Sequence, residues 1–266
     1  MTYQFGRFAI QTSAILILLI IFVFPIIFLV IKSFSQGWIW PMLFPSQWSM
    51  NAWESVGREP QLWEALNNTL IIGLMVTALN LLLGIPAAKV LSRKSRESWV
   101  NTAVFFPLLI PALAIAMGLH LIMIRLGLAD HIAGVILIHL LPSLPYTVRI
   151  LTSAFNRQGP CWEEQAYVLG ASKAASFFQI TFPMILPSIR SASLLAFVIS
   201  LSQYVLTAII GGGTVNTLAI LFYPYFNSVN DGITAAFAVI FALLPVFFII
   251  LLELSLFIYR LALRYS

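Results

Sequence analysis

The sequence has little charge and almost no cysteine. Asp, Glu, Lys and Arg make up 9% of its 266 residues, whereas 61% are apolar. Soluble domains carry about 25% charged residues, so this composition excludes a soluble globular fold and indicates a lipid bilayer as the solvent. The single cysteine, Cys161, excludes an internal disulfide and a cysteine-ligated metal cluster.

The sequence also lacks the motifs of ATP hydrolysis and of metal-dependent catalysis. None of its lysines follows a glycine, which excludes the Gly-x4-Gly-Lys-Ser/Thr phosphate loop. The histidines, His120, His131 and His139, show no metal-ligand spacing. We therefore expect no catalytic residue, no metal site and no cofactor on this chain.

Long stretches of the sequence are free of charged residues. Six such windows approach the roughly 20 helical residues that cross about 30 Å of hydrocarbon. Helices are the expected form, because the short alternating segments of a membrane barrel are absent from the sequence. We predict an all-α polytopic membrane protein, one transmembrane domain over residues 1–266, with six spans at 9–31, 66–88, 100–124, 132–154, 190–210 and 233–258.

The basic residues fall mainly on one side of these spans. Cytoplasmic loops of membrane proteins hold the excess of Lys and Arg near the span ends. One side takes Arg7, Lys89, Arg93, Lys94, Arg96, Arg149, Arg157, Lys173, Arg190, Arg260 and Arg264, and the other only Lys32, Arg58 and Arg125. This asymmetry predicts that both termini and the loop at 156–187 are cytoplasmic. The net charge of +5 then reflects topology, and we expect no nucleic-acid partner.

The predicted cytoplasmic loop at 156–187 has the signals of a helix, a turn and a helix. Pro160 suits a first helical turn, and Glu163 and Glu164 favour the positive end of the helix dipole. Gly170 stands where a left-handed residue ends such a helix. We expect a second helix from about residue 172 that ends at Pro183.

The turn between the two predicted helices is rich in compact residues. We expect Ala166, Gly170 and Ala171 to be exposed there, so that another protein can approach the backbone, with Glu164 offering a charge-assisted contact. An amphipathic connector on the membrane surface is the alternative, and the pattern alone does not decide between them.

The same loop carries a spaced motif. Counted from Glu164, glycine follows after six residues, phenylalanine after thirteen, isoleucine after sixteen and proline after nineteen, at Gly170, Phe177, Ile180 and Pro183. This spacing closely resembles the Glu-Ala-Ala loop of permease subunits in type I binding-protein-dependent ABC importers, the superfamily of maltose, methionine and polyamine permeases. Gln165 and Phe182 depart from it, since alanine and leucine are usual there.

The resemblance implies a six-helix permease of a bacterial-type cytoplasmic membrane. Its partners would be cytoplasmic ABC ATPases that bind ATP and Mg, a second permease subunit, identical or homologous, and an extracytoplasmic solute-binding protein. The imported solute would be small, from the branch that handles polyamines, thiamine, iron or oxyanions. The residues that would couple to the ATPase are Glu163, Glu164, Ala166, Gly170, Ala171, Phe177, Ile180 and Pro183.

Polar residues cluster in the fourth and fifth predicted spans. Such residues face protein or water in membranes, so they either line the solute pathway or join helices by hydrogen bonds. Both interpretations stay open for His139, Ser143, Tyr146, Ser200, Ser202, Gln203, Tyr204 and Thr207.

Two other functional classes fit the sequence less well. A secondary transporter would be expected to show ion-coupling acids or bases in its spans and internal repeats, and neither is evident in the sequence. An intramembrane enzyme would need a converging catalytic set, which the three histidines do not provide.

Overall fold

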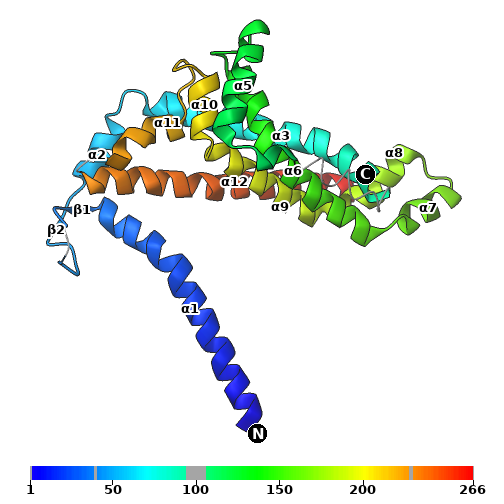
Figure 1. Ribbon diagram of the computed structural model, residues 1–266. Coiled ribbons are helices and arrows are strands. Elements are labelled where there is room, and N and C mark those ends of the chain that lie inside the picture. The colour runs from blue at the N-terminus through cyan, green and yellow to red at the C-terminus, as the bar shows by residue number, and fades with distance from the viewer. Residues whose placement is uncertain (1, 39–40, 94–105, 228–229, 266) are drawn as a thin grey trace. The chain divides into compact units, whose positions relative to one another are not determined.

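The computed structural model describes residues 2–38, 41–93, 106–227 and 230–265, and most of these are helical (Figure 1). The chain forms two compact units, one of Met1–Leu62 with Phe222–Leu244 and the other of Trp63–Leu221 with Pro245–Ser266. The single transmembrane domain over residues 1–266 stays a prediction.

The first unit joins the N-terminal helix to the beginning of the C-terminal one. Its elements are α1 (Thr2–Ser33), β1 (Ser35–Gln36), β2 (Gln47–Trp48), α2 (Asn51–Gly57), η3 (Tyr223–Asn227) and the first part of α12 (Asp231–Tyr265). The two short strands pair antiparallel, which the all-helical prediction did not include. An ion pair of 3.2 Å between Lys32 Nζ and Asp231 Oδ2 joins α1 to α12.

The second unit contains the larger share of the described helices. Its elements are most of α3 (Leu62–Arg93), η1 (Phe106–Leu109), α5 (Ala112–Arg125), α6 (Ile132–Gln158), α7 (Cys161–Val168), α8 (Lys173–Ser176), the π-helical segment η2 (Phe177–Thr181), α9 (Phe182–Leu201), α10 (Tyr204–Ile210), most of α11 (Leu218–Phe222) and the end of α12. α6 and α9 lie side by side (Figure 1).

Small residues bring the helices of the second unit close together. Ala192 and Ala196 on α9 are buried, as is typical where membrane helices approach each other. A Cβ added at Gly84 on α3 would lie 2.8 Å from Cγ2 of Thr147 on α6, so the glycine sets this approach. The phenyl rings of Phe197 on α9 and Phe248 on α12 stack with 4.2 Å between centroids.

Four of the described helices are long and apolar enough to cross a membrane. They are Leu62–Arg93, Ile132–Gln158, Lys173–Leu201 and Asp231–Ile258, and two shorter apolar helices cover Leu18–Ser33 and Ala112–Arg125. They overlap the predicted spans, with longer bounds for most. The count of six spans stays a prediction.

Two of the predicted spans are not continuous helices. Part of the span at 100–124 lies outside the described residues, and its described part breaks between η1 and α5, where Pro111 caps α5. The span at 190–210 breaks after Leu201, and α10 starts at Tyr204. Gln203 stabilises this second break, because its side-chain amide donates a hydrogen bond of 3.0 Å to the Ile199 carbonyl.

Candidate functional site

The first helix of the loop is built from the local signals in the sequence. α7 runs from Cys161 to Val168, with Pro160 as its N-cap residue. After it, Gly170 has a φ of 85°, a left-handed conformation that residues with a side chain rarely adopt. The Ala171 N–H donates to the Ala166 carbonyl at 2.9 Å and the Gly170 N–H to the Tyr167 carbonyl at 3.0 Å, the two bonds of a Schellman motif.

The second helix of the loop does not end where the sequence predicts. Ser172 caps it by accepting a hydrogen bond of 3.2 Å from the Ala175 N–H, but the helix continues past Pro183 as far as Leu201. A proline inside an α-helix removes one backbone bond and clashes with the carbonyl four residues earlier. The π-helical segment η2 ends two residues before this proline, and its wider turn accommodates the proline ring.

The side chains exposed at the tip of the loop are not all those expected from the sequence. Glu164 and Gly170 are exposed, whereas Ala171, Phe177, Ile180 and Pro183 are half-buried. Ala166 is buried at 5% exposure, so its expected place on the surface is wrong. It lies three residues after the buried Glu163, on the inward face of α7. The most exposed side chains are instead the apolar Val168 and Leu169, at 88% and 86%.

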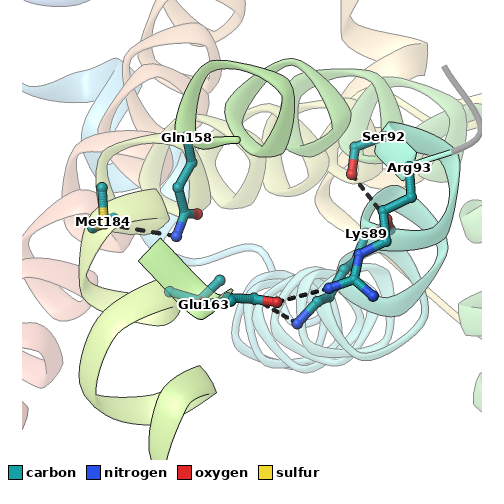
Figure 2. A network of polar contacts seen from close by, with 7 residues as sticks. Lys89, Ser92, Arg93, Gln158, Glu163 and Met184 are labelled. Carbon is teal, nitrogen blue, oxygen red and sulfur yellow. Dashed lines mark hydrogen bonds and ion pairs between the residues drawn. The ribbon is translucent and has the colours of Figure 1, made fainter. Parts of the chain in front are cut away.

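Glu163 lies at the centre of a polar network (Figure 2). Its Oε1 accepts hydrogen bonds of 2.7 Å from Lys89 Nζ and from Thr181 Oγ1. Its Oε2 accepts one of 2.7 Å from Arg93 Nη2. Lys89 and Arg93 belong to α3 and Thr181 to η2, so one carboxylate joins three segments of the second unit.

Two opposing effects act on the pKa of Glu163. Burial alone would raise the pKa, but hydrogen bonds from Lys89 and Thr181, together with the charges of Lys89 and Arg93, outweigh it and lower the pKa. Glu163 is therefore ionised at neutral pH and serves as the counter-ion of two cations. The sequence feature that indicates an acidic partner for α3 is the basic pair Lys89 and Arg93, four residues apart on one face of the helix.

The predicted pathway residues separate into buried and accessible ones. His139 is buried, with Nδ1 3.0 Å from Ser200 Oγ and Nε2 2.9 Å from Thr207 Oγ1. Thr207 Oγ1 also donates to the Gln203 carbonyl, so it accepts from Nε2–H, and Ser200 then donates to Nδ1. His139 thereby connects α6 to both sides of the break between α9 and α10.

The remaining pathway residues lie in different surroundings. Ser143 is buried and accepts a hydrogen bond of 2.8 Å from Asn80 Nδ2 on α3. Tyr146 and Ser202 are exposed, and Gln203 and Tyr204 are half-buried. Gln203 also borders a cavity of about 420 Å³ at the two helix breaks, whose lining includes Ile110, Pro111, Pro142 and Leu206.

The described residues do not form a metal site. Nowhere within the described ranges do three His, Cys, Asp or Glu side chains gather closely enough to hold an ion.

The chain shares its sequence pattern and its fold with known transport proteins. Residues 80–257 match the family model of the binding-protein-dependent transport system inner membrane component. The chain belongs to this family. It is an ABC permease, and the matched residues include both α3 cations of the Glu163 network and the whole of the loop.

Named relatives of this permease transport different solutes. It is 31% identical over 236 residues to the putrescine transport system permease protein PotI of Escherichia coli (strain K12), covering 82% of this chain and 80% of that one. It is also 31% identical over 180 residues to the molybdate/tungstate transport system permease protein WtpB of Pyrococcus abyssi, covering 67% and 71%.

A solved structure shares the fold of this permease. It is a bacterial ABC transporter involved in the import of the acidic polysaccharide alginate, with a TM-score of 0.67, 18% sequence identity, and coverage of 94% of this chain and 96% of that one. At this identity the match supports the fold alone.

Proposed function

We propose that this permease forms part of the solute pathway of an ABC importer and is driven by a separate ATPase that docks at α7. The importer lies in a bacterial-type cytoplasmic membrane, with six spans and both termini in the cytoplasm. ATP and Mg bind to the ATPase subunits, a second permease completes the pathway, and an extracytoplasmic protein delivers the solute.

The observation that carries this proposal is the shape of the loop after α7. The Schellman motif fixes the backbone at Gly170, and Val168 and Leu169 leave almost their whole side chains exposed. Exposed apolar side chains on a rigid, compact tip suit insertion into a cleft of another protein. Glu164, exposed on the same helix, adds a charged contact.

Substitutions at Gly170 test this docking. A Cβ at Gly170 would meet no atom within 4 Å, so Gly170→Ala adds only the left-handed backbone cost of about 1–2 kcal/mol. Gly170→Trp adds the same cost and a bulky ring on the docking tip. We expect both variants to insert into the membrane, and Gly170→Trp alone to lose the ATPase on co-purification, by about tenfold or more. Equal ATPase retention in both variants would contradict docking at α7.

The solute is a small polar molecule in this proposal, from the polyamine, thiamine, iron or oxyanion branch. Relatives named for putrescine and for molybdate or tungstate support that range. Ligands added singly to the partner solute-binding protein should include one that raises its melting temperature, and a sugar that did so instead would move the permease to another branch.

A further inference from the structure

Two adjacent carboxylates on α7 face opposite environments. Glu164 is exposed, whereas the side chain of Glu163 is 6% exposed and uses both oxygens for bonds to other segments. Figure 2 shows the Glu163 carboxylate pointing toward Lys89 and Arg93 on α3. The two residues therefore have different roles, although they are identical in type and neighbours in sequence.

The bonds of Glu163 make a stiff connection. Hydrogen bonds between ionised groups are shorter and stronger than neutral ones, and here two cations hold the two oxygens of one carboxylate. Lys89 Nζ also lies 5.4 Å from the centre of the Phe177 ring on η2, within cation–π range. A displacement of α7 relative to α3 would have to break both ion pairs of Glu163 together.

α3 is long enough to carry a displacement far from the loop. It has 32 residues between Leu62 and Arg93, which corresponds to about 48 Å of helix at 1.5 Å per residue. Its bonded cations lie in its last two turns, at the end nearest to α7.

We propose that Glu163 is a positioning residue that locks α7 to α3, so that movement of a docked ATPase is passed to α3, while Glu164 faces the ATPase. This inference rests on the proposed function, because it takes α7 as the docking helix. It adds a second path for that movement, since α8, η2 and α9 already follow α7 along the chain.

The distance between α7 and α3 during the ATP cycle tests this role. The exposed Cys161 on α7, the only cysteine of the chain, accepts one spin label, and Val90→Cys on α3, where Val90 is 55% exposed, accepts the other. The permease is purified with its ATPase and second permease in lipid nanodiscs. Distances between the two labels are measured by pulsed electron paramagnetic resonance, without nucleotide and with ATP and vanadate. Complexes that carry a single label on each permease identify the distances between permease copies.

We expect the distance to be the same in both states when Glu163 is intact, because the two helices move together. With Glu163→Gln the distance distribution should shift when nucleotide binds. Glu164→Gln, the matched control, should keep the unchanged distance in every complex that retains its ATPase. If Glu163→Gln does not fold, Arg93→Gln serves as a milder variant, because the Arg93 side chain is 59% exposed. We expect it to show a smaller shift of the distance when nucleotide binds.

Two results would overturn the role of Glu163. One is a distance that changes with nucleotide in the unsubstituted complex, and the other is a distance that stays constant in Glu163→Gln. Either result leaves ATPase docking intact, because retention of the ATPase is measured separately in the same samples. If the proposed function is wrong, Gly170→Trp should retain as much ATPase as Gly170→Ala.

Discussion

Two buried polar clusters of the second unit join helices by different chemistry. The Glu163 cluster, outside the predicted spans, holds an acid between two cations, of which Lys89 is 26% and Arg93 59% exposed. The His139 cluster, inside the predicted spans, uses an imidazole and two hydroxyls. Ions lose much of their solvation in lipid, so a charged link is suited to the edge of the membrane and a link of hydrogen bonds to its interior.

Breaking the charged cluster should have the larger effect. Glu163→Gln keeps an acceptor for Thr181 but removes the charge that balances Lys89 and Arg93, and turns an amide N–H₂ toward a cation. Removing one partner of a fully buried ion pair costs about 3–5 kcal/mol. We expect less here, about 2 kcal/mol, because water screens the partly exposed cations.

The measurement is the free energy of unfolding in mixed detergent micelles. Glu164→Gln changes the same residue type at the next, exposed position and should change the free energy of unfolding by less than about 0.5 kcal/mol. Equal losses in the two variants would remove the distinction between the inward and the outward carboxylate.

Lowering the pH should remove the contribution of Glu163 without a substitution. Its folded-state pKa lies below the ordinary value of 4.5, so its stabilisation is fully present above that value and is lost as pH falls through the folded pKa. The stability difference between the unsubstituted permease and Glu163→Gln should therefore stay constant from pH 7 to about pH 5 and shrink below pH 4.5. Paired unfolding curves across this range measure it, and a gap that widens on acidification would show that the pKa is raised.

Breaking the neutral cluster should cost less. His139→Leu removes two hydrogen bonds, but the hydroxyls of Ser200 and Thr207 can turn to carbonyls of their own helices. Interhelical hydrogen bonds in membranes average about 0.6 kcal/mol, so we expect a loss of about 1 kcal/mol. Tyr146→Phe, at an exposed position two turns along α6, is the control and should leave the unfolding free energy unchanged. A loss from His139→Leu larger than that from Glu163→Gln would reverse the order of the two clusters.

Local structure was predictable where one residue has a strong conformational preference. Pro160 and Gly170 correctly marked the two ends of α7, because a fixed φ and a left-handed φ are properties of the residues themselves. The end predicted at Pro183 was wrong, because the π-helical segment before it depends on how the neighbouring turns pack. The family followed from the motif spacing at Glu164 and is confirmed by the match over residues 80–257.

The partners of the polar residues were not predictable from the sequence. Glu163 and Glu164 have the same chemistry and adjacent positions, and the apolar residues of the short α7 do not gather on one face that would indicate which glutamate points inward. His139 finds its partners 61 and 68 residues away, at a break in the predicted fifth span that the sequence did not indicate. Hydrogen-bond partners across helices depend on rotation and register, which one sequence does not specify.

The smallest effect should come from the bond between Asn80 and Ser143. Asn80 Nδ2 also donates to the Val76 carbonyl of its own helix at 2.8 Å, so it keeps one bond when the serine hydroxyl is lost. We expect Ser143→Ala and Asn80→Leu to cost about 0.5 kcal/mol each, and the double variant to cost less than their sum, because no donor is then left without its acceptor. A double-mutant cycle on the unfolding free energy measures this coupling. Additivity of the two single losses would mean that the contact between Asn80 and Ser143 contributes nothing to stability.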